Sequence, residues 1–167
     1  MALVKDGRAV ADLWTHLSDD DPVPANGAIT VSWDRWMKDR DALNRDPSQL
    51  GLRAPNTVAV SDLGANAEKC SLIILSFPKF GDGRAYSQAR VLRERYGYKG
   101  EIRATGDVLR DQLLFMQRCG IDAFEVAERA ITENWFSALK EFDTFYQPGA
   151  DNRPWIARQR LAASGGS

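Results

Sequence analysis

The sequence predicts a single α/β domain in which about five strand–helix units form a mostly parallel sheet, either open or curled into a partial TIM-like barrel. Runs with strand character alternate with helical patterns about five times, which is the rhythm of a parallel sheet. Residues 72–75 are continuously apolar, as in a parallel strand covered on both faces. With 167 residues the chain is too short for a complete eight-unit barrel, which needs roughly 250.

Composition and charge narrow the class of protein. The chain is 44% hydrophobic and 27% charged, which is typical of a soluble globular protein. Its formal net charge of -1 argues against a nucleic-acid binder, and no segment is apolar enough to predict a membrane span. Two cysteines without CxxC spacing, Cys70 and Cys119, predict buried reduced thiols and a cytoplasmic protein.

The first 27 residues predict a hairpin-like arm, because the turn sequence Lys5–Asp6–Gly7 lies between apolar ends. Ile29 and Val31 alternate with polar neighbours as in a strand, and a helix is expected from Trp33 to Leu43. The polar, proline-containing residues 46–56 predict a connection.

The middle of the chain carries the clearest strand and helix patterns. Strands are expected at residues 57–61 and 71–77, with room for a short helix between them. The helix that follows Gly83 places Ala85, Ala89 and Leu92 on one apolar stripe.

The last predicted elements repeat the same pattern. Strands at residues 101–104 and 122–126 enclose a helix from Val108 to Arg118, and an amphipathic helix is expected over 128–142. The α/β domain is therefore expected to span residues 1–150, and 151–167 to form a tail whose SGGS end is typical of disorder. The uncovered edges of such a sheet favour a homodimer or a partner protein.

The loop after the 71–77 strand is the first candidate site. Ligands of parallel sheets bind in the loops at the carboxyl ends of the strands. Gly83 lets the backbone approach a ligand, and helix N–H groups with Lys79 and Arg84 could hold a sulfate, phosphate or carboxylate, with Ser87 one turn further on. The alternative is an ordinary helix start that Asp82 caps.

The next loop, in the sequence RATGD, repeats the arrangement. Arg103, Gly106 and Gln112 are further anion-binding candidates, and Arg103 with Asp107 could instead be a structural ion pair. If both loops face one cavity, Arg84 and Arg103 form the anion-binding pair. Asp82 and Asp107 are then the candidate catalytic proton carriers.

Several kinds of site are not predicted. His16 is the single histidine and falls in the irregular arm, which argues against a metal centre or a Ser–His triad. No glycine-rich nucleotide motif occurs, so no cofactor is expected. Arg90, Arg93 and Arg95 are expected on the outer helix face, with Glu94 pairing Arg90, and a docking patch for an acidic protein is the alternative.

Residues 77–124, FPKFGDGRAYSQARVLRERYGYKGEIRATGDVLRDQLLFMQRCGIDAF, resemble the bacterial domain-of-unknown-function family 934. Members of that family are often labelled as oxidoreductases of sulfite reduction. The positions that carry the resemblance are Phe77, Pro78, Phe80, Asp82, Gly83, Arg84, Ser87, Arg90, Arg93, Gly100, Arg103, Gly106, Asp107, Asp111 and Gln112.

The resemblance implies a role in assimilatory sulfate reduction, beside sulfite reductase and phosphoadenylyl-sulfate reductase. Three hypotheses follow from it and from the residues. The first is an accessory protein that binds a small oxyanion or docks to the reductase. The second is a stand-alone enzyme acting on a sulfur- or phosphate-containing small molecule, and the third is a non-catalytic dimeric scaffold.

Overall fold

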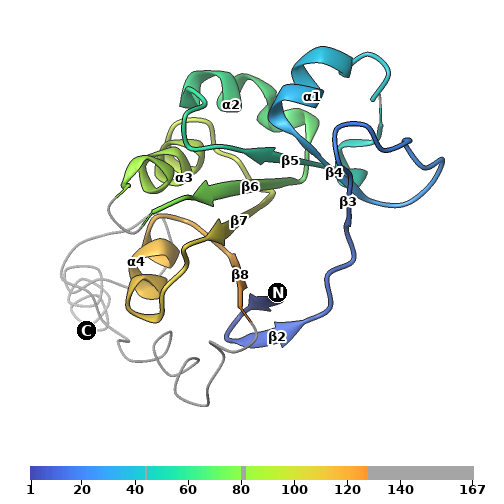
Figure 1. Cartoon of the computed structure of the whole chain (residues 1–167). Coiled ribbons are helices and arrows are strands. Elements are labelled where there is room, and N and C mark those ends of the chain that lie inside the picture. The colour runs from blue at the N-terminus through green and yellow to red at the C-terminus, as the bar shows by residue number, and fades with distance from the viewer. Residues whose placement is uncertain (44, 80–81, 128–167) are drawn as a thin grey trace, which may run out of the picture.

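The computed structural model describes residues 1–43, 45–79 and 82–127, and these form an α/β structure with one curled, mixed sheet (Figure 1). The eight strands are β1 (Ala2–Lys5), β2 (Arg8–Val10), β3 (Thr15–His16), β4 (Ile29–Ser32), β5 (Leu50–Ala54), β6 (Leu72–Phe77), β7 (Glu101–Gly106) and β8 (Ala123–Val126). The four α-helices are α1 (Trp33–Asp39), α2 (Val60–Asn66), α3 (Arg84–Glu94) and α4 (Leu113–Arg118). Short 3₁₀ turns cover Pro47–Gln49, Ala67–Lys69 and Arg110–Gln112.

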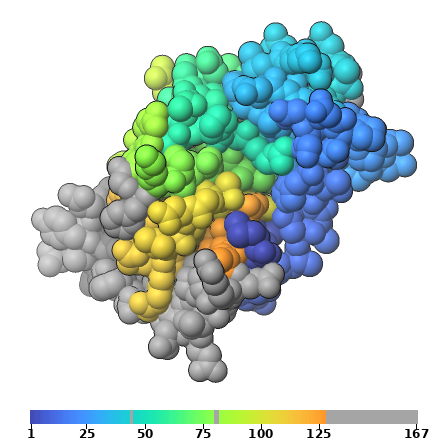
Figure 2. All heavy atoms as spheres, viewed as in Figure 1, coloured from blue at the N-terminus to red at the C-terminus, as the bar shows by residue number. Residues whose placement is uncertain are grey.

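The strand order is β2-β1-β8-β7-β6-β5-β4-β3. Neighbouring strands from β3 to β8 are parallel, whereas β1 is antiparallel to both β8 and β2. Figure 2 shows the N-terminal strand lying against β8. The helices lie along one side of the sheet, and the link from β2 to β3 runs along the other (Figure 1). We call the side along which this link runs the concave face.

Several predicted elements are confirmed. β1 and β2 form an antiparallel hairpin around Asp6 and Gly7, with Leu3 opposite Val10. The strand at Ile29, the strand that ends at Phe77 and the helix after Gly83 occur where the sequence predicts them. The 27-residue arm is more regular than expected, because it contributes three strands to the sheet.

Two neighbouring predictions are wrong. Residues 57–61 are a loop and the start of α2, and the strand lies in the preceding segment, where a connection was expected. Strand β5 contains Gly51, and glycine is depleted in strands. Gly51 is required there because a Cβ at this position would lie 2.9 Å from Cγ2 of Thr30 on β4.

Other elements differ in length or lie outside the described residues. The predicted 33–43 helix ends at Asp39, although Leu43 is buried as expected. The predicted 108–118 helix begins as a 3₁₀ turn and becomes α-helical only at Leu113, and Leu109 is 39% exposed and does not anchor it. The predicted helix over 128–142 and the tail over 151–167 lie outside the described residues. None of the described helices is long and apolar enough to cross a membrane.

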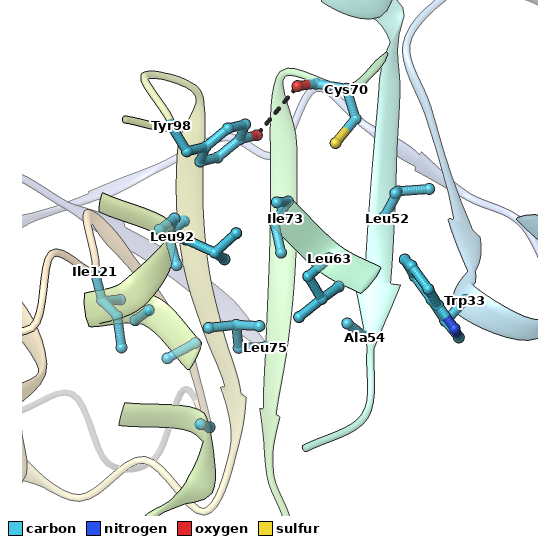
Figure 3. Packing of buried hydrophobic residues seen from close by; sticks show 14 of the residues in the cluster. Trp33, Leu52, Ala54, Leu63, Cys70, Ile73, Leu75, Leu92, Tyr98 and Ile121 are labelled. Atoms are coloured by element: carbon cyan, nitrogen blue, oxygen red, sulfur yellow. Dashed lines mark hydrogen bonds between the residues drawn. The ribbon is translucent and has the colours of Figure 1, made fainter. Parts of the chain in front are cut away.

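The main hydrophobic core lies between the sheet and the helices (Figure 3). Alternate residues of β6, such as Ile73 and Leu75, face this core, as the period of two in a strand requires. The Tyr98 hydroxyl donates to the Cys70 carbonyl oxygen at 3.3 Å, and burial raises the pKa of the Cys70 thiol to about 12. Both cysteines are buried and no disulfide joins them, as the sequence predicts.

Arg93 does not decorate the outer helix face, and this expectation is wrong. Its guanidinium donates to the carbonyl oxygens of Tyr98, Gly100 and Gly120 at 2.6, 2.8 and 3.0 Å. It also pairs with Asp122, whose pKa burial raises. Arg93 therefore joins α3 to the loop before β7 and to the loop between α4 and β8.

We expect Arg93→Ala to destabilise the protein by about 3 kcal/mol, because three carbonyl groups and one carboxylate lose a partner. Arg90→Ala is the matched control on the same helix, since the expected Arg90–Glu94 pair forms at 2.9 Å with Arg90 58% exposed. It should change the free energy of unfolding by less than about 0.5 kcal/mol. Urea unfolding measures both values, and equal effects would contradict the internal role of Arg93.

Candidate functional site

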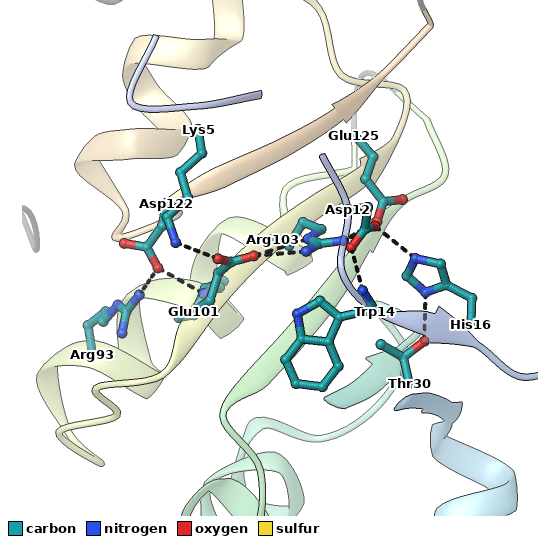
Figure 4. A network of polar contacts seen from close by, with 11 residues as sticks. Lys5, Asp12, Trp14, His16, Thr30, Arg93, Glu101, Arg103, Asp122 and Glu125 are labelled. Atoms are coloured by element: carbon teal, nitrogen blue, oxygen red, sulfur yellow. Dashed lines mark hydrogen bonds and ion pairs between the residues drawn. The ribbon is translucent and has the colours of Figure 1, made fainter. Parts of the chain in front are cut away.

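Strand β7 is polar on the concave side of the sheet and apolar on the helix-covered side. Along β7, Ile102 and Ala104 face the hydrophobic core, so the alternating residues Glu101, Arg103 and Thr105 face the concave side. Arg103 is only 1% exposed and is the largest fully buried side chain among the described residues. The link between β2 and β3 lies over it (Figure 4).

Three carboxylates surround this buried guanidinium. Arg103 Nη1 donates to Asp12 Oδ2 at 2.7 Å and to Glu125 Oε1 at 3.1 Å. Its Nε and Nη2 both donate to Glu101 Oε1, at 3.2 and 3.0 Å. Lys5 Nζ donates to the other oxygen of Glu101 at 2.7 Å. We call Arg103, Asp12, Glu101 and Glu125 the Arg103 cluster.

In the Arg103 cluster, hydrogen bonds and ion pairs shift the pKa values of Asp12 and Arg103 more strongly than burial does. Burial alone would raise the pKa of the Asp12 carboxyl, but hydrogen bonds from His16 and Arg103 lower it. Burial alone would lower the pKa of Arg103, but its hydrogen bonds to Asp12 and Glu125 raise it. Three carboxylates on one guanidinium leave Arg103 with no positive charge to offer a further anion, even with Lys5 on Glu101.

His16 lies next to this cluster in strand β3, so its expected place in an irregular part of the arm is wrong. One ring nitrogen, Nε2, lies 2.9 Å from Asp12 Oδ2, and the other, Nδ1, lies 2.7 Å from Thr30 Oγ1. The order Asp–His–Thr resembles a catalytic triad, in which a carboxylate orients a histidine that activates a hydroxyl group. Thr30 is 0% exposed, however, so its hydroxyl orients the imidazole and cannot reach a substrate.

A cavity of about 370 Å³ opens beside the Arg103 cluster. We call it the concave cavity, and it is lined by His16, Arg53, Ala54, Pro55, Ile74, Ser76, Thr105 and Glu125. Ser76 and Thr105 are register partners on β6 and β7, so their side chains lie side by side. Arg53 donates to the Leu17 carbonyl oxygen and has no ion pair with any residue that the structure describes.

The loop after β6 places the predicted residues elsewhere. Arg84 donates to Asp82 through Nε at 3.0 Å and Nη2 at 2.6 Å, and Asn56 donates to the same carboxylate at 2.7 Å. These contacts, the Arg84 hydrogen bond above all, lower the pKa of Asp82. Arg84 and Ser87 line a second cavity of about 290 Å³, which Asn56 and Gln88 share.

Asp82 accepts a hydrogen bond at the start of helix α3, which agrees with the alternative interpretation of this loop as an ordinary helix start. Its Oδ1 accepts from the Arg84 backbone N–H at 3.2 Å, at the start of α3. Lys79 is exposed, and its carbonyl oxygen accepts from the Asp82 N–H.

The predicted residues of the next loop do not gather around one ligand position. Arg103 lies under the arm on the concave face, whereas Arg84 begins α3 on the helix-covered face, so the two form no common pair. Gly106 has a φ of 100°, and a Cβ there would lie 2.5 Å from the Phe77 carbonyl oxygen. Asp107 donates its N–H to that same oxygen at 2.7 Å. The side-chain Oε1 of Gln112 is buried without a partner among the described residues.

The structure also brings together residues that could hold a metal ion. Asp12, His16 and Glu125 each offer one ligand atom, and these atoms lie within 4.8 Å of one another. The sequence does not indicate this group, because Glu125 is more than one hundred residues away from Asp12 and His16 in the chain.

The fold and the cavity define an α/β protein with a polar cavity on the concave face of a curled sheet. Residues 51–156 match the model of a family described as bacterial protein of unknown function (DUF934). The match covers more than half of the chain, and the chain belongs to this family. A comparison with curated proteins finds no match. The family match includes Arg53, Ser76, Arg103, Thr105 and Glu125 of the site.

We expect Asp12→Asn to lower the free energy of unfolding at pH 7 by about 2 kcal/mol, because Arg103 loses an ionic hydrogen bond. The pKa of Asp12 is lowered in the folded state, so its contribution is present above the unfolded-state value of about 3.9 and is lost as the pH falls through the folded-state value. As the pH falls below about 4, the free energy of unfolding should therefore decrease less in the variant than in the wild type.

Urea unfolding between pH 7 and pH 2.5 measures this difference. Asp20→Asn is the control, since Asp20 is an exposed carboxylate of the same arm without a hydrogen bond to another described residue. An acid dependence of Asp12→Asn identical to that of the wild type would rule out the Arg103 cluster as its source.

Proposed function

We propose that this protein binds a small molecule carrying an oxyanion in the concave cavity, and that it serves as an accessory protein of assimilatory sulfate or sulfite reduction. The observation that carries the binding proposal is Arg53. Its guanidinium lines the cavity without a carboxylate partner among the described residues, so its charge is available to a ligand.

The hydroxyl groups beside Arg53 suit the same ligand. Ser76 and Thr105 line the cavity from adjacent strands, and each hydroxyl can donate one hydrogen bond to an oxyanion. A volume of about 370 Å³ is at the small end of the range for ligand sites and exceeds the needs of a bare sulfate ion. The cavity therefore has room for a bare oxyanion and also for an oxyanion attached to a small organic group.

The position of the cavity within the fold supports this proposal. Its lining includes Ala54, Ser76 and Thr105, which lie at the carboxyl ends of β5, β6 and β7. Parallel sheets and complete barrels bind their ligands at these ends. We infer that the curled sheet works as a partial barrel whose strand–helix units are mostly parallel.

The pathway in this proposal comes from the resemblance of residues 77–124 to proteins labelled for sulfite reduction. Sulfite reductase and phosphoadenylyl-sulfate reductase are the proposed partners, and sulfate, sulfite or a phosphosulfate supplies the anion. A docking surface built on Arg93 is not part of the proposal, since that side chain is engaged within the chain.

A stand-alone enzyme is the second function, and Asp82 does not favour it. Its lowered pKa and its ion pair with Arg84 make this carboxylate a weak base. Asp107 remains the candidate general base of that hypothesis. Turnover of a sulfur or phosphate ester by the purified protein, lost in Asp107→Asn, is the result that the enzyme hypothesis requires.

We expect millimolar sulfate, sulfite or adenosine 3′-phosphate 5′-phosphosulfate to raise the melting temperature of the wild-type protein, because a ligand that binds only the folded state stabilises it. Arg53→Ala should abolish the shift. Arg84→Ala is the matched control, since it removes an arginine from the other candidate loop and leaves the concave cavity intact.

The two variants separate the candidate sites. A shift that survives in Arg53→Ala and disappears in Arg84→Ala would move the anion to the loop after β6. The absence of any shift with all three compounds would contradict the binding proposal.

We expect deletion of the gene to impair growth on sulfate or sulfite as the sole sulfur source and to spare growth on sulfide, because sulfide enters after the reduction steps. The measurement is the growth rate on each source, with the wild-type gene and the Arg53→Ala gene returned to the deletion strain. Unimpaired growth of the deletion strain on all three sources would argue against the pathway.

A further inference from the structure

We propose that Asp12, His16 and Glu125 form a binding site for a divalent transition-metal ion such as Zn²⁺, Mn²⁺ or Fe²⁺. Each side chain offers one ligand atom, and the three atoms lie within 4.8 Å of one another. An imidazole nitrogen with two carboxylate oxygens is a ligand set that suits these ions. Two of the ligands come from the arm and the third from β8.

The separations suit one ion after a small adjustment. Bonds of about 2.0–2.2 Å allow two ligands of one ion to lie at most about 4.4 Å apart. Asp12 Oδ2 and His16 Nε2 are already 2.9 Å apart, so only the wider separations have to close. Asp12 and His16 are exposed, and rotation of their side chains can supply this movement.

The imidazole is already oriented for this role. His16 Nδ1 lies 2.7 Å from the hydroxyl of Thr30, which is completely buried in β4. A hydrogen bond at one ring nitrogen fixes the orientation of the ring and leaves the other nitrogen as the ligand. Thr30 thus directs Nε2 toward the two carboxylates (Figure 4).

The charge of the surroundings favours a cation. Asp12, Glu101 and Glu125 are three carboxylates that share two cationic partners, Arg103 and Lys5, among the described residues. These five side chains together carry an excess negative charge next to the concave cavity. A bound cation would compensate it.

Arg103 competes with a metal ion for Asp12 and Glu125, and its other contacts show how the site can hold the guanidinium and the ion together. Its Nε and Nη2 donate to Glu101, which is not one of the proposed ligands. The guanidinium therefore keeps this partner when an ion takes Asp12 and Glu125. Because a carboxylate has two oxygens, Glu125 can bind the ion through one and accept from Arg103 through the other.

An ion in this position would have open coordination sites facing the concave cavity, because His16 and Glu125 also line that cavity. Three protein ligands with open positions are typical of metal sites that bind a further molecule. Arg53 is not among the proposed ligands. The metal site and the proposed anion site can therefore be tested separately.

The experiment uses the full-length, untagged protein after treatment with a chelator, titrated with Zn²⁺, Mn²⁺ and Co²⁺ in a calorimeter. We expect saturable binding of one ion per chain. His16 is the single histidine of the chain, so paramagnetic Co²⁺ or Mn²⁺ should shift or broaden its imidazole signals in the NMR spectrum. His16→Gln and Glu125→Gln should each weaken binding by at least about tenfold.

Glu101→Gln is the matched control, because it removes the same charge from the same guanidinium but no proposed ligand. It should weaken metal binding by less than about threefold. Thermal unfolding without metal verifies that each variant is folded.

Three results would overturn the proposal. One is the lack of saturable binding by the wild-type protein up to about 1 mM metal. Another is unchanged affinity in His16→Gln, and the third is equal weakening by Glu101→Gln and Glu125→Gln. A failure of the anion to bind, with metal binding intact, would count only against the proposed function.

Discussion

The burial of the Arg103 guanidinium is the interaction on which the concave side of the molecule depends. A buried charge is tolerated only when opposite charges and hydrogen bonds replace the lost water. Arg103 finds them in Glu101 of its own strand, Glu125 of the neighbouring strand and Asp12 of the arm. The contact with Asp12 fastens the arm across the concave face, and so holds β3 beside β4 at the far edge of the sheet.

The same constraint shapes the cavity. The arm brings His16 toward Glu125, and these two residues form the wall of the concave cavity that adjoins the Arg103 cluster. Arg53 also lines this cavity, and it hydrogen-bonds to the carbonyl oxygen of Leu17, the residue that follows β3. Three carboxylates neutralise Arg103, whereas Arg53 donates to a main-chain oxygen, which does not neutralise it. Arg53 is therefore the arginine of this face that has no carboxylate partner among the described residues.

Much of the fold could be predicted from the sequence, because the signals of β6, α3 and β7 are local. The apolar run before Phe77 and the stripe that includes Ala89 and Leu92 need no distant partner to be recognised. Strand β5 is not predicted by its local sequence, because glycine is unfavourable in strands. Gly51 is needed there for the close approach of Thr30, which the local sequence does not show. The segment 57–61 looked like a strand because its valines alternate, yet Val60 begins a helix.

The site was harder to predict than the fold for a related reason. Arg84 and Arg103 are equally prominent in the sequence, but the charge that each can offer is set by carboxylates. The carboxylate of Arg84 is two residues away at Asp82, and was visible as a helix cap. Of the three carboxylates around Arg103, only Glu101 is equally close in the sequence, whereas Glu125 is 22 residues away and Asp12 is 91 residues away, on an arm predicted to be irregular. Arg53 has no such partner among the described residues. A local pattern can therefore show where arginines lie, whereas the pairing across the curled sheet determines which one remains free to bind.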